Sequence, residues 1–190
     1  MTRPSLSDRA AGLDLVPLAQ ATQADRMGLR AIRNEDGVRA NMYSDAPIPE
    51  DAHRAWLGRV LDDPATAYFA VRHDGRLAGA LAFTGIDHRH RRADWAFYLS
   101  AATRGRGLGR ALELRALDLA FGPMALHKLS CEVIDWNAAV VALHRDFGFA
   151  EEGLRRDHVL RDGAWYHVHL LGLTAPDWAA RRPHITGESP

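Results

Sequence analysis

The stretch WAFYLSAATRGRGLGRALEL, residues 95–114, joins an alternating apolar run to a turn rich in glycine and arginine and then to a leucine-patterned segment. The alternation predicts a strand, and the spacing of Leu108, Leu112 and Leu119 predicts a helix that ends near residue 121. Backbone N–H groups at the start of a helix are unpaired, and glycines let an anion approach them closely. The stretch therefore predicts a phosphate-binding turn between a strand and a helix, with a pyrophosphate as a sensible ligand.

Two common phosphate-binding motifs do not match this turn. Residues 105–109 read G-x-G-x-G, whereas dinucleotide-binding folds need G-x-G-x-x-G and a second strand that ends in an acidic residue. Walker loops need G-K-[ST], which the turn lacks. The remaining alternative is a glycine-eased turn that binds nothing, which Arg104 and Arg106 disfavour because they add positive charge.

The composition is that of a single globular domain. The chain has 190 residues, 47% hydrophobic and 25% charged, with a formal net charge of zero, which argues against a nucleic-acid or membrane surface. No stretch approaches the roughly 20 apolar residues that span a bilayer, and Cys131 is the only cysteine, so no disulfide can form within the chain. We expect a cytoplasmic protein with one domain at 13–180, a flexible N-terminus at 1–12 and a flexible tail at 181–190.

Hydrophobic periodicity and turn residues predict a mixed α+β fold. The expected strands are 13–18, 65–72, 76–86, 92–100, 127–134, 151–160 and 164–173. The expected helices begin near residue 23 and also cover 49–61, 107–121 and 137–147. This order predicts a central, mostly antiparallel sheet of six to seven strands flanked by about four helices, with one parallel pair bridged by the 107–121 helix.

Two motifs together resemble the GCN5-related N-acetyltransferases (GNATs). The first is R-x-x-G-x-G at residues 104–109, and the second is CEVIDWNAAVVALHRDFGFAEEG at 131–153, in which Asn137 opens a helix ending in G-F. The resemblance covers roughly residues 13–173. It implies the GNAT fold, in which the fourth and fifth strands splay apart, and acetyl-CoA as cosubstrate.

In that family the amides of the turn hold the acetyl-CoA pyrophosphate, and pantetheine lies along the free edge of the fourth strand as an added strand. The expected cofactor-binding residues are Phe97, Tyr98, Leu99, Arg104, Gly105, Arg106, Gly107, Leu108, Gly109, Arg110 and Asn137.

Glu132 is the candidate base for the attacking amine. It is charged in the middle of an apolar strand, and alternation places it on one face with Ser130 while Cys131 takes the other. Glu132 could take the amine proton directly or through water, or it could be an ordinary ion-paired glutamate. Because Cys131 would point into packing, direct attack in a ternary complex is favoured over an acyl-cysteine route.

Two residues are candidate acids for the departing thiolate. Many GNATs have a tyrosine seven residues after the helix-opening asparagine, and His144 stands at that position here. An imidazole can donate a proton near neutrality, so His144 is either that acid or only a wall of the thiol pocket. Tyr98, on the facing strand, is the alternative donor.

The N-terminal half is similar to a narrower group, the N-acetyltransferases of pseudaminic acid biosynthesis (PseH type). The segment IRNEDGVRANMYSDAPIPEDAHRAWL, residues 32–57, contains R-N, V-R-x-x-M and H-x-x-W. Those enzymes acetylate the 4-amino group of UDP-4-amino-4,6-dideoxy-N-acetyl-β-L-altrosamine, so the resemblance implies a nucleotide-sugar acceptor. The matching substrate-binding residues are Arg33, His53, Thr84 and Tyr98.

Other functions fit the same motifs. A RimL-like acetyltransferase of protein N-termini would share the second-half motifs, and a CoA-binding module without catalysis would leave Glu132 and His144 dispensable. His167 and His169 share a strand face, but without a third ligand we expect no metal site. A homodimer is possible if the strand at 164–173 lies at the edge of the sheet.

Overall fold

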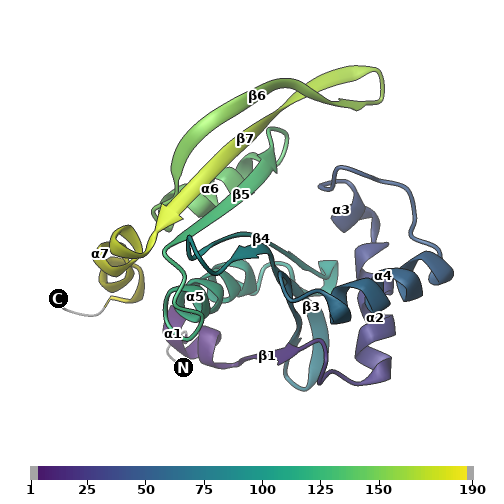
Figure 1. Cartoon of the computed structure of the whole chain (residues 1–190), viewed down its shortest axis with the longest axis horizontal. Coiled ribbons are helices and arrows are strands. Elements are labelled where there is room, and N and C mark those ends of the chain that lie inside the picture. The colour runs from purple at the N-terminus through teal and green to yellow at the C-terminus, as the bar shows by residue number, and fades with distance from the viewer. Residues whose placement is uncertain (1–3, 188–190) are drawn as a thin grey trace.

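The computed structural model describes residues 4–187 of the chain, which form one seven-stranded sheet in the order β1-β2-β3-β4-β5-β7-β6 (Figure 1). Every neighbouring pair is antiparallel except β4 and β5, which are parallel. The strands are β1 (Leu13–Pro17), β2 (Ala67–His73), β3 (Arg76–Asp87), β4 (Arg92–Leu99), β5 (Lys128–Ile134), β6 (Ala150–Arg161) and β7 (Ala164–Thr174). The helices are α1 (Leu6–Ala11), α2 (Gln23–Arg33), α3 (Asp36–Arg39), α4 (Glu50–Asp62), α5 (Leu108–Phe121), α6 (Ala138–Asp146) and α7 (Ala175–Thr186), with a 3-10 turn at Ala101–Thr103.

The parallel strands β4 and β5 pair only where they begin. The last residues that they pair are Asp94 and Ser130. Beyond these residues β4 remains paired only with β3, and β5 only with β7. Figure 1 shows the two parts of the sheet diverging from this point. The prediction of a mostly antiparallel sheet with splayed fourth and fifth strands is confirmed, as is the helix α5 that connects them.

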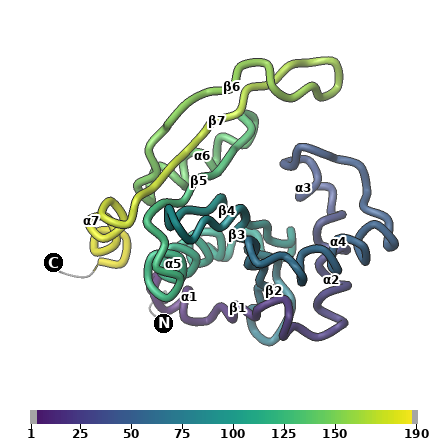
Figure 2. Tube along the Cα trace, in the orientation of Figure 1, coloured from purple at the N-terminus to yellow at the C-terminus, as the bar shows by residue number. Residues whose placement is uncertain are grey.

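Two apolar cores pack against the sheet, and a third, small cluster of Ile134, Val159 and Val168 lies at β5, β6 and β7. The larger core contains most of α5, which is buried nearly all round at Ala111, Leu112 and Leu117, and it also holds Trp178 of α7. The smaller core lies between the sheet and the pair α2 and α4, around Leu29. Figure 2 shows α2, α3 and α4 together at one end of the molecule, away from α7.

Gly79 lets β3 and β4 approach each other closely at the splayed end. It pairs with Leu99, and a Cβ atom on Gly79 would overlap with the carbonyl oxygen of Tyr98, well under the 3.0 Å that real Cβ contacts respect. Only glycine fits this position without moving the backbone of β4.

Three expectations from the sequence need correction. Residues 6–11 are helical rather than frayed, because Ser5 and Asp8 form a capping box that satisfies the first amides of α1. The tail expected from residue 181 is helical to Thr186, within a helix that Thr174 caps; residues 188–190 lie outside the described part. The strand β7 is not an edge, because β6 lies outside it; the edge strands of the sheet are β1 and β6.

Within residues 4–187, no helix is long and apolar enough to cross a membrane.

Candidate active site

The glycine turn joins β4 to the start of α5, as its sequence predicts. Gly105 and Gly107 have φ angles of 75° and 72°, in the left-handed region that favours glycine, and Gly107 caps α5 without a side-chain bond. The next residue, Leu108, is buried and anchors the helix start in the core. The first amides of α5 therefore face away from the helix with no partner in it, as an anion-binding turn requires.

The arginines around the turn have different environments. The Arg104 guanidinium lies against Gly37 of α3, where a Cβ atom would collide with it. Arg106 lines a separate cavity beside the β2–β3 turn. Arg110 is ion-paired with Asp146 and lies over the Phe147 ring at 5.1 Å, so it fastens α5 to α6.

One cation near the turn was missed from the sequence. Arg9 of α1 lies beside Gly107, with its Nε atom 3.4 Å from where a Cβ on that glycine would be. The Nε atom is buried without a hydrogen-bond partner. The sequence signal for it was the capping box of Ser5 and Asp8. This motif predicts a helix that contains Arg9, where we had expected a flexible N-terminus.

The predicted pantetheine edge is available in the structure. Phe97, Tyr98 and Leu99 pair with β3 on one side, and β5 has already parted from β4 before these residues. Asn137 stands at the N-terminal end of α6 and makes no side-chain capping bond there. These residues fit an extended ligand with amide groups, although their contact with one stays a prediction.

Glu132 lies on the exposed face of β5 and already has two partners. Its Oε2 accepts a hydrogen bond from the Tyr43 hydroxyl, and its Oε1 lies 2.6 Å from Nη1 of Arg155. Burial raises the pKa of Tyr43 to about 12, and the bond to Glu132 adds to this effect. The carboxylate therefore joins β5 to the α3–α4 connection and to β6. Neither partner was predicted, because both are distant in sequence.

The two candidate acids lie on opposite faces of β4. His144 is buried on the α5 side, with its ring 6.3 Å from that of Phe97. The next residue of β4, Tyr98, points to the α2 side, where its hydroxyl donates to the Leu29 carbonyl oxygen at 3.4 Å. Burial raises the pKa of Tyr98, which makes it a poorer acid in this structure.

Cys131 is buried, as the alternation of the strand predicts. Burial raises the pKa of its thiol, and the nearby Glu113 carboxyl adds to this effect. A buried thiol with a raised pKa is a poor nucleophile. Direct attack by the acceptor is therefore favoured over an acyl-cysteine.

Three of the four predicted acceptor-site residues come together around one cavity of about 210 Å³. Arg33, His53 and Tyr98 line it, and the other lining residues are Ile48, Trp56 and Tyr68. Thr84 is not among them: it lies on β3 four residues beyond Ala80, the partner of Tyr98, or about 13 Å along the strand.

The residues that line this cavity include one arginine, Arg33, and no carboxylate. Arg33 Nη2 donates to the Ser44 carbonyl oxygen at 3.2 Å, whereas Nη1 is buried without a partner. Desolvation lowers the pKa of Arg33 from its usual value. A buried donor of this kind favours a ligand with an acceptor oxygen.

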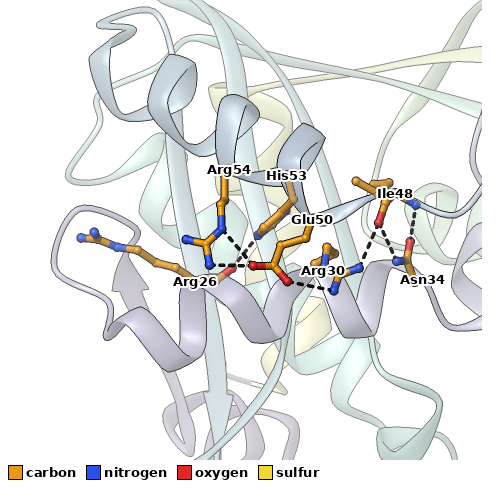
Figure 3. Close-up of polar contacts among 7 residues, drawn as sticks. All are labelled: Arg26, Arg30, Asn34, Ile48, Glu50, His53 and Arg54. Atoms are coloured by element: carbon orange, nitrogen blue, oxygen red, sulfur yellow. Dashed lines mark hydrogen bonds and ion pairs between the residues drawn. The ribbon is translucent and has the colours of Figure 1, made fainter.

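The cavity is held in shape by polar contacts between α2 and α4 (Figure 3). His53 is bonded through Nε2 to the Arg26 carbonyl oxygen at 2.8 Å, and its ring stacks on Trp56 at 5.2 Å. Asn34 exchanges two hydrogen bonds with the backbone of Ile48, at 3.0 and 2.8 Å. His53 is therefore a buried wall residue with one ring nitrogen already engaged, not a solvent-facing one.

The family model of the Acetyltransferase (GNAT) family matches residues 29–149, which includes the glycine turn, both splayed strands and α6. The chain belongs to this family. As a GNAT, it is an acetyl-CoA-dependent N-acetyltransferase. Within the described residues, no group of three or more His, Cys, Asp or Glu is arranged to hold a metal ion.

Individual GNATs give further comparisons. The chain is 35% identical over 151 residues to spermidine N(1)-acetyltransferase of Vibrio cholerae, covering 77% of this chain and 87% of that protein. It is 25% identical over 166 residues to the prophage-derived, uncharacterized N-acetyltransferase YokL of Bacillus subtilis, covering 81% and 93%. In fold it resembles the crystal structure of the Vibrio cholerae spermidine enzyme with CoA and spermine, with a TM-score of 0.81 and 22% identity over 89% of this chain and 99% of that one.

Proposed function

We propose that this GNAT transfers the acetyl group of acetyl-CoA to the amine of a small acceptor that also carries an anionic group. The observation that carries the proposal is that Arg33, whose Nη1 is buried without a hydrogen-bond partner, lines a cavity that has no carboxylate in its lining. An anionic oxygen bound there would satisfy that donor, whereas a polycation would meet a like charge.

A UDP-linked 4-amino sugar is the acceptor of this class that we propose. Its phosphates supply the anion for Arg33, and its rings suit a cavity walled by Trp56, Tyr68 and Tyr98. The sequence of residues 32–57 led us to expect the same acceptor, but the comparisons with known proteins do not support that resemblance, since the relatives they match include spermidine enzymes.

The remaining site residues have roles in direct transfer. The amine attacks the thioester carbon in a ternary complex, and its proton passes to Glu132 or to a water beside it. Glu132 is exposed to solvent on β5, so a water can reach its carboxylate. Its bonds to Tyr43 and Arg155 would hold the carboxylate in one orientation.

Spermidine is the second candidate acceptor, because the Vibrio cholerae relative bears that name. A polyamine needs carboxylates spaced along its path. Glu132 is one, and Asp45, which is ion-paired with Arg161 at 3.4 Å, is a second near the α3–α4 connection. Neither lines the Arg33 cavity.

A thiol-release assay with a panel of amines tests the proposal. The panel holds the UDP-4-amino sugar, spermidine, free amino acids and peptides with an N-terminal alanine. We expect turnover with the anionic amines, most of all with the nucleotide sugar. Turnover confined to spermidine or to the peptides would contradict the proposal while leaving acetyl transfer intact.

The variant Arg33→Met tests the observation itself. Losing a charged hydrogen bond worth about 1.5–3 kcal/mol should raise KM for the anionic acceptor by roughly 10- to 150-fold. Arg59→Met removes the same charge from an exposed position of α4 and should leave that KM unchanged. An Arg33→Met enzyme with the KM of the wild type would refute the role of this cavity.

A further inference from the structure

A buried carboxylate, Glu113 of α5, lies directly beside His144. Glu113 has no exposed surface, and His144 is 4% exposed. Glu113 Oε1 lies 2.8 Å from His144 Nδ1, whereas Glu113 Oε2 is buried without a hydrogen-bond partner. The rings of Trp95 and Phe149 pack on the imidazole, each with centroids 5.2 Å away. The pair is therefore a carboxylate and an imidazole enclosed in an aromatic cage.

The pair lies where the splayed strands part. Asp94 is the last residue of β4 that pairs with β5, and the next residue, Trp95, packs directly on His144. On the β5 side, Glu113 is near enough to Cys131 to raise the pKa of its thiol, and Cys131 follows Ser130, the last residue of β5 that pairs with β4. The imidazole therefore borders the opening between the two strand edges.

The cage favours the form of the pair in which the charges cancel. Burial raises the pKa of Glu113, and the bond from His144 opposes this effect. A lone carboxylate in an apolar cage is costly, so the pair retains a shared proton between Oε1 and Nδ1. In the pair without net charge, either a protonated Glu113 faces a neutral imidazole or an ionised Glu113 faces an imidazolium, and in both states His144 Nε2 carries a hydrogen. Among residues 4–187, His144 Nε2 has no hydrogen-bond partner. It is not fully buried, because the buried polar atoms without a partner do not include it.

Other charged groups near the pair do not replace Glu113. Arg110 and Asp146 are ion-paired with each other, and they act on the pKa of Glu113 in opposite directions. Cys131 contributes a neutral thiol. Glu113 is thus the partner that fixes the state of the imidazole.

We propose that Glu113 is a positioning residue that holds His144 with its Nε2–H available to the departing sulfur of CoA, so that His144 is the general acid of the acetyl transfer. This inference rests on the proposed function at the same site. The amine nitrogen bonds to the thioester carbon, the carbon–sulfur bond breaks, and its electron pair passes to sulfur, which takes the Nε2 proton. The amine proton leaves through Glu132 or water, and the pair regains a proton from solvent after the products depart.

The variant Glu113→Gln keeps the size of the side chain but cannot share a proton with the imidazole. We expect kcat to fall about 10-fold or more near pH 8, within the range of general acid catalysis, while the KM for acetyl-CoA stays within about twofold. In the pH profile of kcat, the alkaline limb should move to lower pH, because the neutral amide no longer stabilises the form of the site in which His144 carries the proton for the thiolate. In His144→Gln this limb should disappear, and Glu113→Gln should then cost nothing more.

Asp25→Asn is the matched control. Like Glu113→Gln, it turns a buried carboxylate into an amide. Asp25 lies on α2, where it is ion-paired with Arg72. Its kcat profile should keep the shape of the wild type. A folded Glu113→Gln enzyme with the wild-type kcat profile would overturn the proposal.

A measurement without variants or acceptor reads the proton directly. In ¹⁵N NMR of histidine-labelled wild type at pH 7, the His144 signal, assigned by its loss in His144→Gln, should show a protonated Nε2. An unprotonated Nε2 would overturn the proposal even if the Glu113 variant failed to fold. Absence of turnover with every amine, in contrast, would refute the proposed function and leave this protonation state readable.

Discussion

Alanine substitutions at three glycines separate the folding role of the turn from its binding role. Gly107 has a φ of 72°, so Gly107→Ala should lower the free energy of unfolding by about 1–2 kcal/mol; its new Cβ would lie 3.4 Å from the movable Arg9 side chain. Gly109 lies inside α5, where a Cβ would meet Leu143 Cδ2 at an ordinary 4.0 Å. Gly109→Ala should therefore raise the free energy of unfolding by about 0.5–1 kcal/mol.

The binding of acetyl-CoA should rank these variants differently. If the pyrophosphate lies against the first amides of α5, the methyl group of Gly109→Ala blocks its approach, and the Kd for acetyl-CoA should rise at least about 10-fold in spite of the higher stability. Gly58→Ala is the control, because this glycine of α4 has nothing within 4 Å of its Cβ position. It should gain similar stability and keep the wild-type Kd.

Urea unfolding without ligand gives the free energy of unfolding, and isothermal titration calorimetry gives the Kd for acetyl-CoA. Wild-type affinity in Gly109→Ala would refute the placement of the pyrophosphate on this turn. Wild-type stability in Gly107→Ala would refute the argument from its left-handed backbone.

Three further predictions concern the sheet and the site. Gly79→Ala would press its methyl group on the Tyr98 carbonyl and should cost about 1–3 kcal/mol in urea unfolding; an unchanged midpoint would contradict the close contact. Because burial raises the pKa of Glu113, the folded state binds its proton more tightly than the unfolded state. Relative to Glu113→Gln, the protonated Glu113 therefore stabilises the folded protein fully at pH values below the pKa that its carboxyl has in the unfolded state. This stabilisation is lost as pH rises, by up to about 1.4 kcal/mol per pH unit, and parallel stability curves of the two proteins from pH 5 to 8 would exclude it. The pKa of Tyr43 is raised to about 12, so its contribution to stability is full below about pH 10 and lost toward pH 12; Tm differences between wild type and Tyr43→Phe should shrink over that window and not below it.

Local signals predicted the parts of the site that a short segment builds alone. The glycine spacing predicted a turn at the start of a helix, and Gly105 and Gly107 form that turn in the left-handed conformation that favours glycine. The chain order of strands and helices predicted the parallel pair, and alternation along β5 predicted that Cys131 is buried and Glu132 exposed.

Contacts between distant segments were not predictable from these signals. The Tyr43 hydroxyl reaches Glu132 from the α3–α4 connection, and nothing in the local sequence of either residue indicates the other. Glu113 had a weak signal, an acid inside a helix that is otherwise apolar on most faces, but its partner His144 lies on another helix. Either strand of the last hairpin could pair with β5, and the sequence of the hairpin is compatible with both orders. In the structure β7 pairs with β5, and β6 lies outside it.

A single competition reaction tests the central claim, that this GNAT has an acceptor site built for an anionic amine. Acetyl-CoA is supplied with equal concentrations of the UDP-4-amino sugar and spermidine, and mass spectrometry measures both acetylated products over the initial rate. Arg33, whose Nη1 has no partner, lines a cavity without carboxylates, which predicts that the acetylated sugar exceeds acetylspermidine by at least about 10-fold. An excess of acetylspermidine would contradict the account.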